Sequence, residues 1–366
     1  VRIGNHSNSD KHEWYRDEKE REEAKSKDPL PKWKEFVIEE KIFTKKKLEE
    51  LEAQCKEELM AAHKAAVKAP HPEPESIYDF VLPPAYEAEK YPDGTHDEEG
   101  EGIKLIPALN ETLKAEFRHN PDTYIWGQDM ANGEKGGIFN VSKGMQQEFG
   151  PERVFNAPIA EDYIVGTANG MSRFNKDIRI VVEGAEFADY FWPAMEQLVE
   201  CSHDYWRSNG AFAPNITIRL ASGGYIGGGL YHSQTIEGTL TTFPGIRVVY
   251  PSFADDAAGL LRTSLRSEGP TLYLEPKTCY NAKYAMSAVP EDFEVPFGKA
   301  RYRRRGKDLS IITYGNTVHF SLNVAEKLAD EGYDIEVLDL RSLSPLDEDA
   351  IYETVANTHR ALVVHE

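Results

Sequence analysis

Strand-like and helix-like patterns alternate along the chain from about residue 107. Short apolar runs have strand length and β-branched content, and amphipathic stretches of helical length separate them; the runs lie at 123–126, 153–156, 178–183, 214–220, 246–250 and 271–275. This alternation predicts a doubly wound α/β fold, in which helices cover both faces of a parallel sheet. A second series begins near residue 295, with strands at 309–313, 335–338 and 361–364 and helices around 322–328 and 347–356. It predicts a further α/β domain.

The first third of the chain has a different pattern. Polar residues at 4–10 predict a loop, Asp28 followed by Pro29 predicts the start of one helix, and Thr44 predicts the N-cap of another that ends at Pro70. Prolines and the acidic run 97–101 predict an extended linker before residue 106. The expected organisation is therefore a helical tail at 1–79, a linker at 80–106, an α/β domain at 107–290 and a second, truncated α/β domain at 291–366.

Composition narrows the class of protein. With 40% apolar and 11% aromatic residues among 366, the chain can bury a large core. A net charge of -20 argues against nucleic acid and against anionic membranes as partners. Three dispersed cysteines indicate neither a disulfide framework nor a cysteine zinc site, and they favour a reducing cytoplasm. No apolar run has the length of a membrane span. Because it opens without methionine and stops just after a strand-like run, we expect the chain to be part of a longer polypeptide.

The first candidate for chemistry is Glu161. The strand at 153–156 stops before Pro158, and the apolar pattern restarts at helical spacing with Ile164, so Glu161 is expected at a strand-to-helix corner. In open α/β sheets, ligands bind at such corners, outside the carboxyl ends of the strands. A carboxylate there can also serve only to stabilise the positive end of the helix. This segment alone does not distinguish the two roles.

Two further strand ends carry polar or aromatic side chains. The glycine-rich run 223–234 contains His232, and the segment 183–192 contains Glu186 and Tyr190. Each has an ordinary structural explanation, namely a tight turn and a helix entry with core aromatics. Three strand ends nevertheless supply an acid, an aromatic cluster and a histidine to one edge of one sheet. Their convergence predicts a ligand site at that edge.

Seven motifs in order resemble the β subunit of thiamine-diphosphate-dependent 2-oxo acid dehydrogenases, the decarboxylating first component of a multienzyme complex. The motifs are GQDM, GGIF, FGPERVFNAPIAE, EFADYFWPAMEQ, TIRLASGGYIGGGLYHSQ, FPGIRVVYPS and GPTLYLEPK. The resemblance covers about 105–366 and is greatest to the branched-chain type. Residues 1–78, opening RIGNHSNSD, resemble the C-terminal end of the α subunit in the same family. The resemblance implies an α–β fusion with a transketolase-like pyrimidine-binding domain and part of a transketolase C-terminal-like domain.

The resemblance also implies roles for single residues. Glu161 matches the glutamate that bonds N1' of the cofactor's aminopyrimidine, and it would be buried against Ile159. Tyr190 would pack on the pyrimidine ring, and Glu186 would lie beside it. His232 matches a histidine near the reacting carbon. Arg2, His6 and Ser7 match a loop beside the diphosphate and the substrate channel, where His6 is a catalytic candidate and animal relatives are phosphorylated at the serine matching Ser7. A K⁺ site of some relatives matches Ile216, Thr217, Ser264, Ser267 and Gly269, although three of these five differ in side chain.

The implied reaction is oxidative decarboxylation of a 2-oxo acid, either a branched-chain 2-oxo acid or pyruvate, with acyl transfer to a lipoyl-bearing dihydrolipoyl acyltransferase. The chain contains no GDG motif, so the Mg²⁺ ligands are expected in an α portion outside it. The active site is expected to be composite, within a dimer or tetramer. Transketolase-like ketol transfer and a non-catalytic scaffold role are the alternatives. The FADY and LYHSQ motifs argue against the first, and Glu161 with His232 argue against the second.

Overall fold

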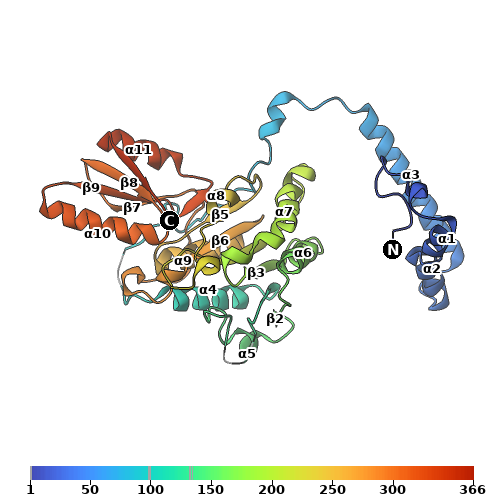
Figure 1. The fold of residues 1–366 in the computed structure, drawn as a ribbon, viewed down its shortest axis with the longest axis horizontal. Helices are drawn as coiled ribbons and strands as arrows, with labels where there is room; N and C mark the ends of the chain where they lie inside the picture. The colour runs from blue at the N-terminus through green and yellow to red at the C-terminus, as the bar shows by residue number, and fades with distance from the viewer. Residues whose placement is uncertain (1, 98–99, 132, 134) are drawn as a thin grey trace. The chain divides into compact units, whose positions relative to one another are not determined.

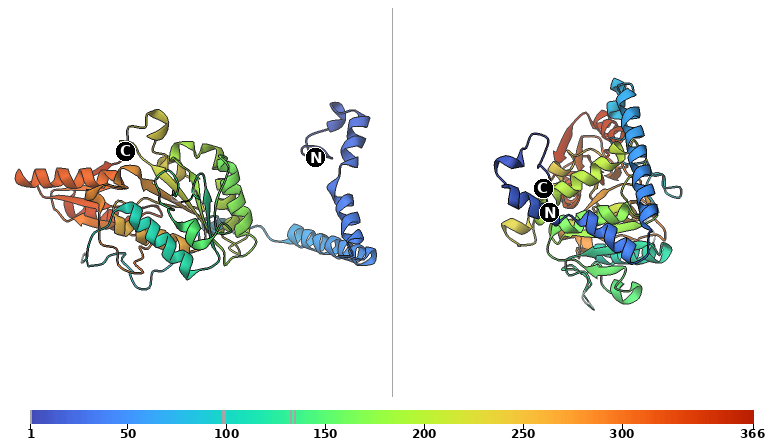
Figure 2. Two further views of the ribbon diagram at one scale, coloured as in Figure 1. Left: turned by 90° about the horizontal axis from the view of Figure 1, so that it is seen from below. Right: turned by 90° about the vertical axis from the view of Figure 1, so that its right-hand side faces the viewer.

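The computed structural model describes residues 2–97, 100–131, 133 and 135–366, in two compact units, Val1–Ser76 and Ile77–Glu366 (Figure 1). The first unit is helical, and in it α2 and α3 meet at an angle (Figure 2). Its elements are η1 His12–Trp14, α1 Glu18–Ser26, α2 Pro29–Glu39 and α3 Lys45–Lys68, and the turn η2 Pro74–Tyr78 spans the boundary between the units.

Side-chain caps start the three helices of the first unit. Asp28 accepts a hydrogen bond from the Leu30 amide and Thr44 from the Lys47 amide, which confirms the two predicted helix starts. The sequence did not reveal α1, because a segment of almost only charged residues has no apolar stripe. None of the residues of α3 is buried, and Leu51, Leu59, Met60 and Val67 are exposed.

A seven-stranded sheet is the centre of the second unit. Its order is β10-β5-β6-β4-β3-β1-β2, and all neighbours are parallel except β10 and β5. The strands are β1 Thr123–Gly127, β2 Val154–Asn156, β3 Arg179–Ala185, β4 Ile216–Ser222, β5 Arg247–Val249, β6 Thr271–Pro276 and β10 Ser342–Ser344. The six strands predicted from the apolar runs are all present within a few residues of the expected bounds.

Helices cover both faces of this sheet, which confirms the doubly wound prediction. On one face Val181 of β3 joins a core with α4 (Leu105–His119) and α9 (Ala254–Arg266). On the other face Ile180 and Val182 join a core with α6 (Glu161–Ser172) and α7 (Met195–Arg207). Successive residues of β3 thus point to opposite cores, as the period of a strand requires. Short helices α5 Met145–Phe149 and α8 Glu237–Leu240 and turns η3 Ala188–Tyr190, η4 Trp192–Ala194, η5 Leu230–His232, η6 Lys277–Cys279 and η7 Lys283–Ala285 complete this part.

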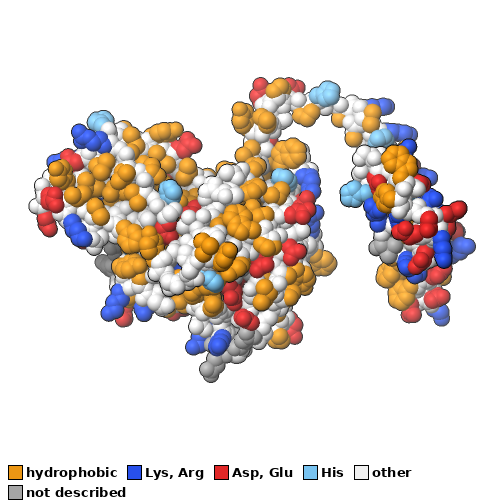
Figure 3. Space-filling view, in the orientation of Figure 1, with side chains coloured by type: hydrophobic (Ala, Val, Ile, Leu, Met, Phe, Trp, Pro, Cys, Tyr) orange, Lys and Arg blue, Asp and Glu red, His pale blue; other side chains and the backbone are white. Residues whose placement is uncertain are grey.

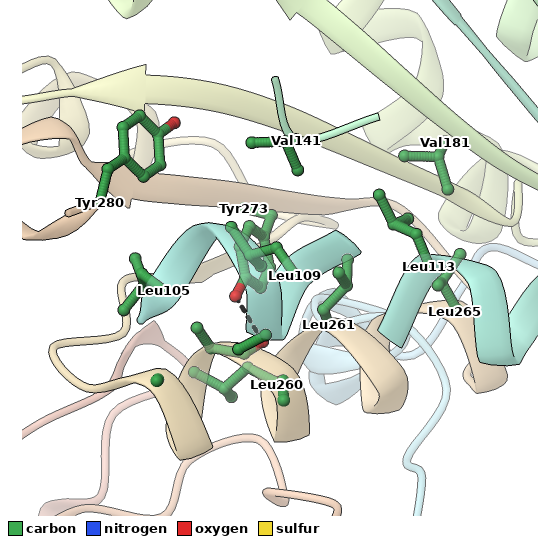
Figure 4. Close-up of a cluster of buried hydrophobic side chains, with 14 of the residues drawn as sticks. Leu105, Leu109, Leu113, Val141, Val181, Leu260, Leu261, Leu265, Tyr273 and Tyr280 are labelled. Carbon is green, nitrogen blue, oxygen red and sulfur yellow. Dashed lines mark hydrogen bonds between the residues drawn. The ribbon is translucent and has the colours of Figure 1, made fainter. Parts of the chain in front are cut away.

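The core under α4 and α9 shows how these helices are held. Leucines of α4 interdigitate with leucines of α9 beneath the sheet (Figure 4); the residues are Leu105, Leu109, Leu113, Leu260, Leu261 and Leu265. Complete burial of each such side chain contributes about 1.5–3 kcal/mol. The Tyr273 hydroxyl, from β6, donates to the Ala257 carbonyl at 2.6 Å, so its polar atom is satisfied inside this core.

A four-stranded sheet forms the last part of the second unit, in the order β11-β8-β9-β7. Ile311 faces α10 (Asn316–Asp330) and Ile312 faces α11 (Glu348–Thr358), so one helix lies on each face. The strands are β7 Arg301–Arg304, β8 Leu309–Thr313, β9 Ile335–Asp339 and β11 Ala361–Val364. The sequence did not reveal β7 and β10, because RYRR and SLS are short edge strands without an apolar run. Since β10 pairs with β5, the chain after residue 291 also contributes to the first sheet.

The segment predicted as an extended linker at 80–106 belongs to the second unit and packs against the rest of it. The Tyr86 hydroxyl donates to Glu294 at 3.0 Å, and guanidinium groups of Arg247 and Arg341 donate to the carbonyls of Pro84 and Gly94. Irregular backbone can be buried here because charged side chains satisfy its carbonyl groups. Helix α4 begins at Leu105, slightly before the predicted end of the linker. Glu98 and Glu99, in the acidic run, lie outside the described residues.

His96 joins this segment to α9 by a hydrogen bond to Asp255. His96 Nε2 lies 3.0 Å from the Asp255 carboxylate and Nδ1 lies 2.7 Å from the Asp97 carbonyl oxygen, while the side chain is 4% exposed. Both partners are acceptors, so both ring nitrogens must donate and the imidazole must be protonated. The hydrogen bond that His96 donates to Asp255 is the main cause that raises the pKa of His96, against burial and the charge of Arg301. Burial disfavours the charged carboxylate, but the bond from His96 and the nearby arginines lower the pKa of Asp255.

We expect His96→Gln to be more destabilising at pH 6 than at pH 9. The folded-state pKa of His96 lies above its unfolded value of about 6.5, so its stabilisation is complete below that value and is lost as pH rises through the folded pKa. Urea unfolding midpoints of the variant and the parent protein at the two pH values measure this. His203→Gln, at an exposed position on α7, is the control. An equal loss of stability at both pH values would contradict the protonated pair.

Candidate functional site

The carboxyl edge of the seven-stranded sheet holds Glu161 at the corner that the sequence predicts. Strand β2 ends at Asn156, and Glu161 is the first residue of α6. Gln128, which follows β1, donates from Nε2 to Glu161 Oε1 at 2.9 Å. Two neighbouring strand ends therefore fix the orientation of a half-buried carboxylate.

Ile159 does not cover Glu161, contrary to the expectation from the resemblance. Its side chain is 83% exposed. It lies in a tight turn between β2 and α6, in which the Ala160 amide donates to the Pro158 carbonyl at 2.8 Å. The turn extends past the last residue of the strand, so the described chain offers no apolar surface on which Ile159 could pack.

The predicted aromatic cluster and the histidine do come together. The His232 ring lies edge-on to Phe187 with a centroid distance of 4.4 Å and edge-on to Tyr190 with a centroid distance of 5.6 Å. Phe187 is buried, whereas Tyr190 is 43% exposed. Both residues follow the end of β3, and His232 lies on the loop that follows β4. An aromatic surface and an imidazole are thus available at the carboxyl edge.

Glu186 lies at the same edge, one residue after β3. Burial, and secondarily the charge of Asp129, raises the pKa of this carboxyl group. No hydrogen bond or ring contact between described residues joins Glu161 to the Tyr190–His232 pair. The structure therefore places the acids and the cluster along one edge and gives them separate local supports.

A buried charge network below this edge was not predicted. Arg219 of β4 donates from Nε and Nη2 to the two carboxylate oxygens of Glu275, at 2.6 and 3.0 Å, and the Tyr280 hydroxyl donates to the same carboxylate at 2.6 Å. Arg219 Nη1 lies 3.8 Å from Glu183 Oε2. Burial raises the pKa of Glu183 to about 8, although Arg219 acts in the opposite direction. The sequence does place a charged residue inside each of three largely apolar strands, namely Glu183, Arg219 and Glu275, and this pattern could have indicated the network.

The five residues matched to a K⁺ site lie at the opposite, amino edge of the sheet. The hydroxyl group of Ser264 donates to the Leu260 carbonyl of α9, and that of Ser267, directly after α9, donates to the Ser264 carbonyl. Arg247 donates from Nη1 to Ser267 Oγ at 3.4 Å and to the Glu268 carbonyl at 2.9 Å. Burial lowers the pKa of Arg247 to about 10, so the guanidinium is still charged at neutral pH. A fixed positive charge beside Ser267 argues against a second cation there. The other matched residues are Ile216, Thr217 and Gly269.

Arg2, His6 and Ser7 belong to the helical unit, where Asp10 organises their loop. The Asp10 carboxylate accepts from the His6 amide at 2.7 Å and from the Tyr15 hydroxyl at 2.6 Å, and Arg2 donates to that hydroxyl at 2.9 Å. Ser7 Oγ lies 2.9 Å from Ser9 Oγ. The side chains of His6 and Ser7 are exposed, so the loop presents them to solvent.

Two negative findings concern the described residues only. They contain no cluster of three or more His, Cys, Asp or Glu side chains arranged to hold a metal ion. Within the same residues no helix has the length and apolar character needed to cross a membrane.

Comparison with protein families finds a match to each of three segments of the chain. Residues 1–75 match the dehydrogenase E1 component, residues 101–283 match the pyrimidine binding domain of transketolase, and residues 298–366 match the transketolase C-terminal domain.

Several characterised proteins are similar over most of their length. The 2-oxoisovalerate dehydrogenase subunit beta of Bacillus subtilis is 38% identical over 266 residues, which cover 72% of this chain and 79% of that protein. The pyruvate dehydrogenase E1 component subunit beta of Staphylococcus aureus is 38% identical over 265 residues, which cover 72% and 80%. Among solved structures, a split gene transketolase described as an inactive beta4 tetramer superposes with a TM-score of 0.55 at 23% identity, covering 73% of this chain and 81% of that one. This last likeness concerns the fold.

We expect Arg219→Met to destabilise the protein by about 3–5 kcal/mol, because it leaves Glu275 buried without its charge partner. Chemical denaturation at pH 7 measures the change. Arg118→Met is a matched control, since Arg118 is 59% exposed and pairs with Glu148 at the surface, where such a pair contributes about 0–1 kcal/mol. Similar losses in the two variants would show that the network does not support the sheet.

Proposed function

Since the chain belongs to the thiamine-diphosphate-dependent 2-oxo acid dehydrogenases, as an α–β fusion of their decarboxylating component, we propose that its carboxyl sheet edge binds the cofactor's aminopyrimidine. The observation that supports this most is Glu161, a half-buried carboxylate oriented by Gln128 at the start of α6. Ligands of open α/β sheets bind at such corners.

The side chains at this edge fit an aminopyrimidine. A ring nitrogen requires a group that can share a proton, which Glu161 offers, and a flat ring requires an apolar or aromatic surface, which the half-exposed Tyr190 offers. Glu186 adds a second carboxyl group near the same strand ends, with a raised pKa. When bound, thiamine diphosphate supplies a carbon nucleophile at C2 of its thiazolium ring.

Glu161 would hold the proton that it shares with N1' of the pyrimidine. The hydrogen bond from Gln128 holds one carboxylate oxygen, so the group does not need to reorient as the proton moves. His232 would act on the substrate side, by moving a proton near the reacting carbon and by orienting the carboxylate of the 2-oxo acid. Its ring contacts with Phe187 and Tyr190 limit its rotation.

The remainder of the cofactor would be held by α-subunit residues. We assign Arg2 and His6 to the side of the diphosphate and the substrate channel, where a guanidinium and an exposed imidazole can contact anionic groups. The ligands of Mg²⁺ are assigned to an α portion outside this chain. The side chain of Ser7 is exposed in the helical unit.

The substrate is proposed to be pyruvate or a branched-chain 2-oxo acid, and the acyl group to pass to the lipoyl group of a dihydrolipoyl acyltransferase. The two substrates differ by a few methylene groups, each contributing about 0.8 kcal/mol when buried. Relatives of both kinds have 38% identity to this chain, so identity does not select one. Reaction rates of the full-length protein with a panel of 2-oxo acids and an artificial electron acceptor would identify the preferred substrate.

An exposed apolar surface supports assembly with further subunits. Tyr225, Ile226, Leu230 and Tyr231 of the glycine-rich loop are exposed, and Tyr225 lies edge-on to the exposed Phe320 of α10 at 5.7 Å. Hydrophobic side chains gather in the region of α10 (Figure 3). Contiguous apolar surface on a soluble protein commonly marks an interaction site. We propose that this surface is covered in a dimer or tetramer.

Glu161→Gln in the full-length protein should retain the fold and most cofactor affinity but lose turnover by about 10²–10⁴-fold, because an amide cannot carry the shared proton. Hydrogen–deuterium exchange at C2 of bound thiamine diphosphate tests the step directly and should slow to a similar extent. The control is Asp162→Asn, on the same helical turn, in which the C2 hydrogen of the cofactor should exchange at the parental rate. Unchanged exchange in Glu161→Gln would refute the assignment.

Docking of the acyltransferase should depend on salt. The family resemblance implies a small basic docking domain, and the net charge of -20 on this chain is complementary to it. Raising ionic strength from about 0.01 to 0.15 M shortens the Debye length from about 30 to 8 Å, so the association rate measured by surface plasmon resonance should fall. A rate that does not change with salt would count against electrostatic docking.

A further inference from the structure

Two rings of the short turn after β3 contact His232. Phe187 and Tyr190 both lie edge-on to the imidazole. Between them in sequence, Asp189 has a side chain with no exposed area. The aromatic contacts limit the position of the ring, but they do not by themselves fix the backbone that carries it.

Asp189 holds the backbone next to His232. Its Oδ1 accepts hydrogen bonds from the backbone amides of Ser233 and Gln234, each at 3.0 Å. These are the two residues directly after His232. Bonds from amides to an ionised carboxylate are roughly twice as strong as neutral ones. The glycine-rich loop after β4 is also held by bonds from the Gly224 amide to Glu366 and from the Ser233 hydroxyl to the Gly229 carbonyl. The two bonds to Asp189 fix the backbone directly after His232.

Lys277 provides the opposite charge. Its ammonium group lies 4.0 Å from Asp189 Oδ2, has no exposed area and lies 5.2 Å from the centre of the Phe187 ring. Burial lowers the pKa of Lys277 to about 8, while Asp189 acts in the opposite direction, so the ammonium is largely charged at neutral pH. Neither Lys277 Nζ nor Asp189 Oδ2 has a hydrogen-bond partner among the described residues. Their attraction, the two amide bonds to Asp189 and the contact of the ammonium group with the Phe187 ring together compensate for burying both charges.

We propose that Asp189 is a positioning residue for His232 and that Lys277 is its counter-charge. The pair joins three strand ends, since Asp189 follows β3, His232 follows β4 and Lys277 follows β6. Displacement of a reacting group by about 1 Å can reduce a rate by about 10²-fold. The inference rests on the proposed role of His232 in the decarboxylation.

Amide hydrogen exchange of the full-length protein tests the positioning without reference to activity. In Asp189→Ala the amides of Ser233 and Gln234 should exchange about tenfold faster or more, because both lose their acceptor. Asp204→Ala is the matched control, because Asp204 is also a buried aspartate but pairs with Arg173 and Arg207. It should leave these two amides at the parental rate. Equal exchange in Asp189→Ala and the parent protein would overturn the proposal.

Activity provides the second measurement. His232→Ala and Asp189→Ala should both reduce decarboxylation about 10-fold or more, and the double variant should be no slower than His232→Ala alone, since Asp189 acts through His232. Losses that multiply in the double variant would show an independent, structural role and overturn the proposal. If His232→Ala is fully active, the proposed role of His232 fails, whereas the exchange experiment still decides whether Asp189 holds the loop.

Two milder variants apply if Asp189→Ala does not fold. Asp189→Asn retains an oxygen that can accept both bonds but loses the charge, and Lys277→Met removes only the counter-charge. Both should raise exchange at Ser233 and Gln234 by less than Asp189→Ala would, about two- to fivefold, because the bonds become weaker without being lost. Parental exchange rates in both variants would contradict the charged pair.

Discussion

A parallel sheet that is covered by helices on both faces leaves only its two ends for polar chemistry. Strand β3 shows why, because Ile180, Val181 and Val182 alternate between two apolar cores and leave no open face. Side chains that must contact a ligand therefore follow the last residues of the strands. Glu161, Tyr190 and His232 all do so at the carboxyl edge. At the amino edge, Arg247 instead donates to the Glu268 carbonyl and to the Ser267 hydroxyl.

Buried ionisable side chains support the carboxyl edge of the sheet. Arg219 is held between Glu275 and Glu183 inside the sheet, and Lys277 lies beside Asp189 below the aromatic turn. Such pairs add little net stability compared with apolar residues, but losing one partner is costly. The positions of these side chains are therefore constrained, and they in turn constrain the loops that follow β3 and β4. This is the connection between the packing of the sheet and the placement of the imidazole.

The strands and the corner at Glu161 could be predicted because apolar runs, Pro158 and helical spacing are local properties of the sequence. The two edge strands could not, since RYRR and SLS acquire strand geometry only from the partners β9 and β5. The packing of residues 80–106 depends on guanidinium groups from distant parts of the chain. The Arg219 network and the Asp189–Lys277 pair likewise join residues far apart in sequence. Motif resemblance identified His232, but not the groups that hold it.

The central claim is that this sheet edge forms the aminopyrimidine side of a thiamine diphosphate site. A cryo-electron microscopy structure of the full-length protein with bound thiamine diphosphate and Mg²⁺ tests it most directly. The account predicts one carboxylate oxygen of Glu161 within hydrogen-bond distance of N1', about 2.6–3.2 Å. The other carboxylate oxygen should still accept the hydrogen bond from Gln128. A pyrimidine ring bound away from α6, with Glu161 in contact only with Gln128 and solvent, would contradict it.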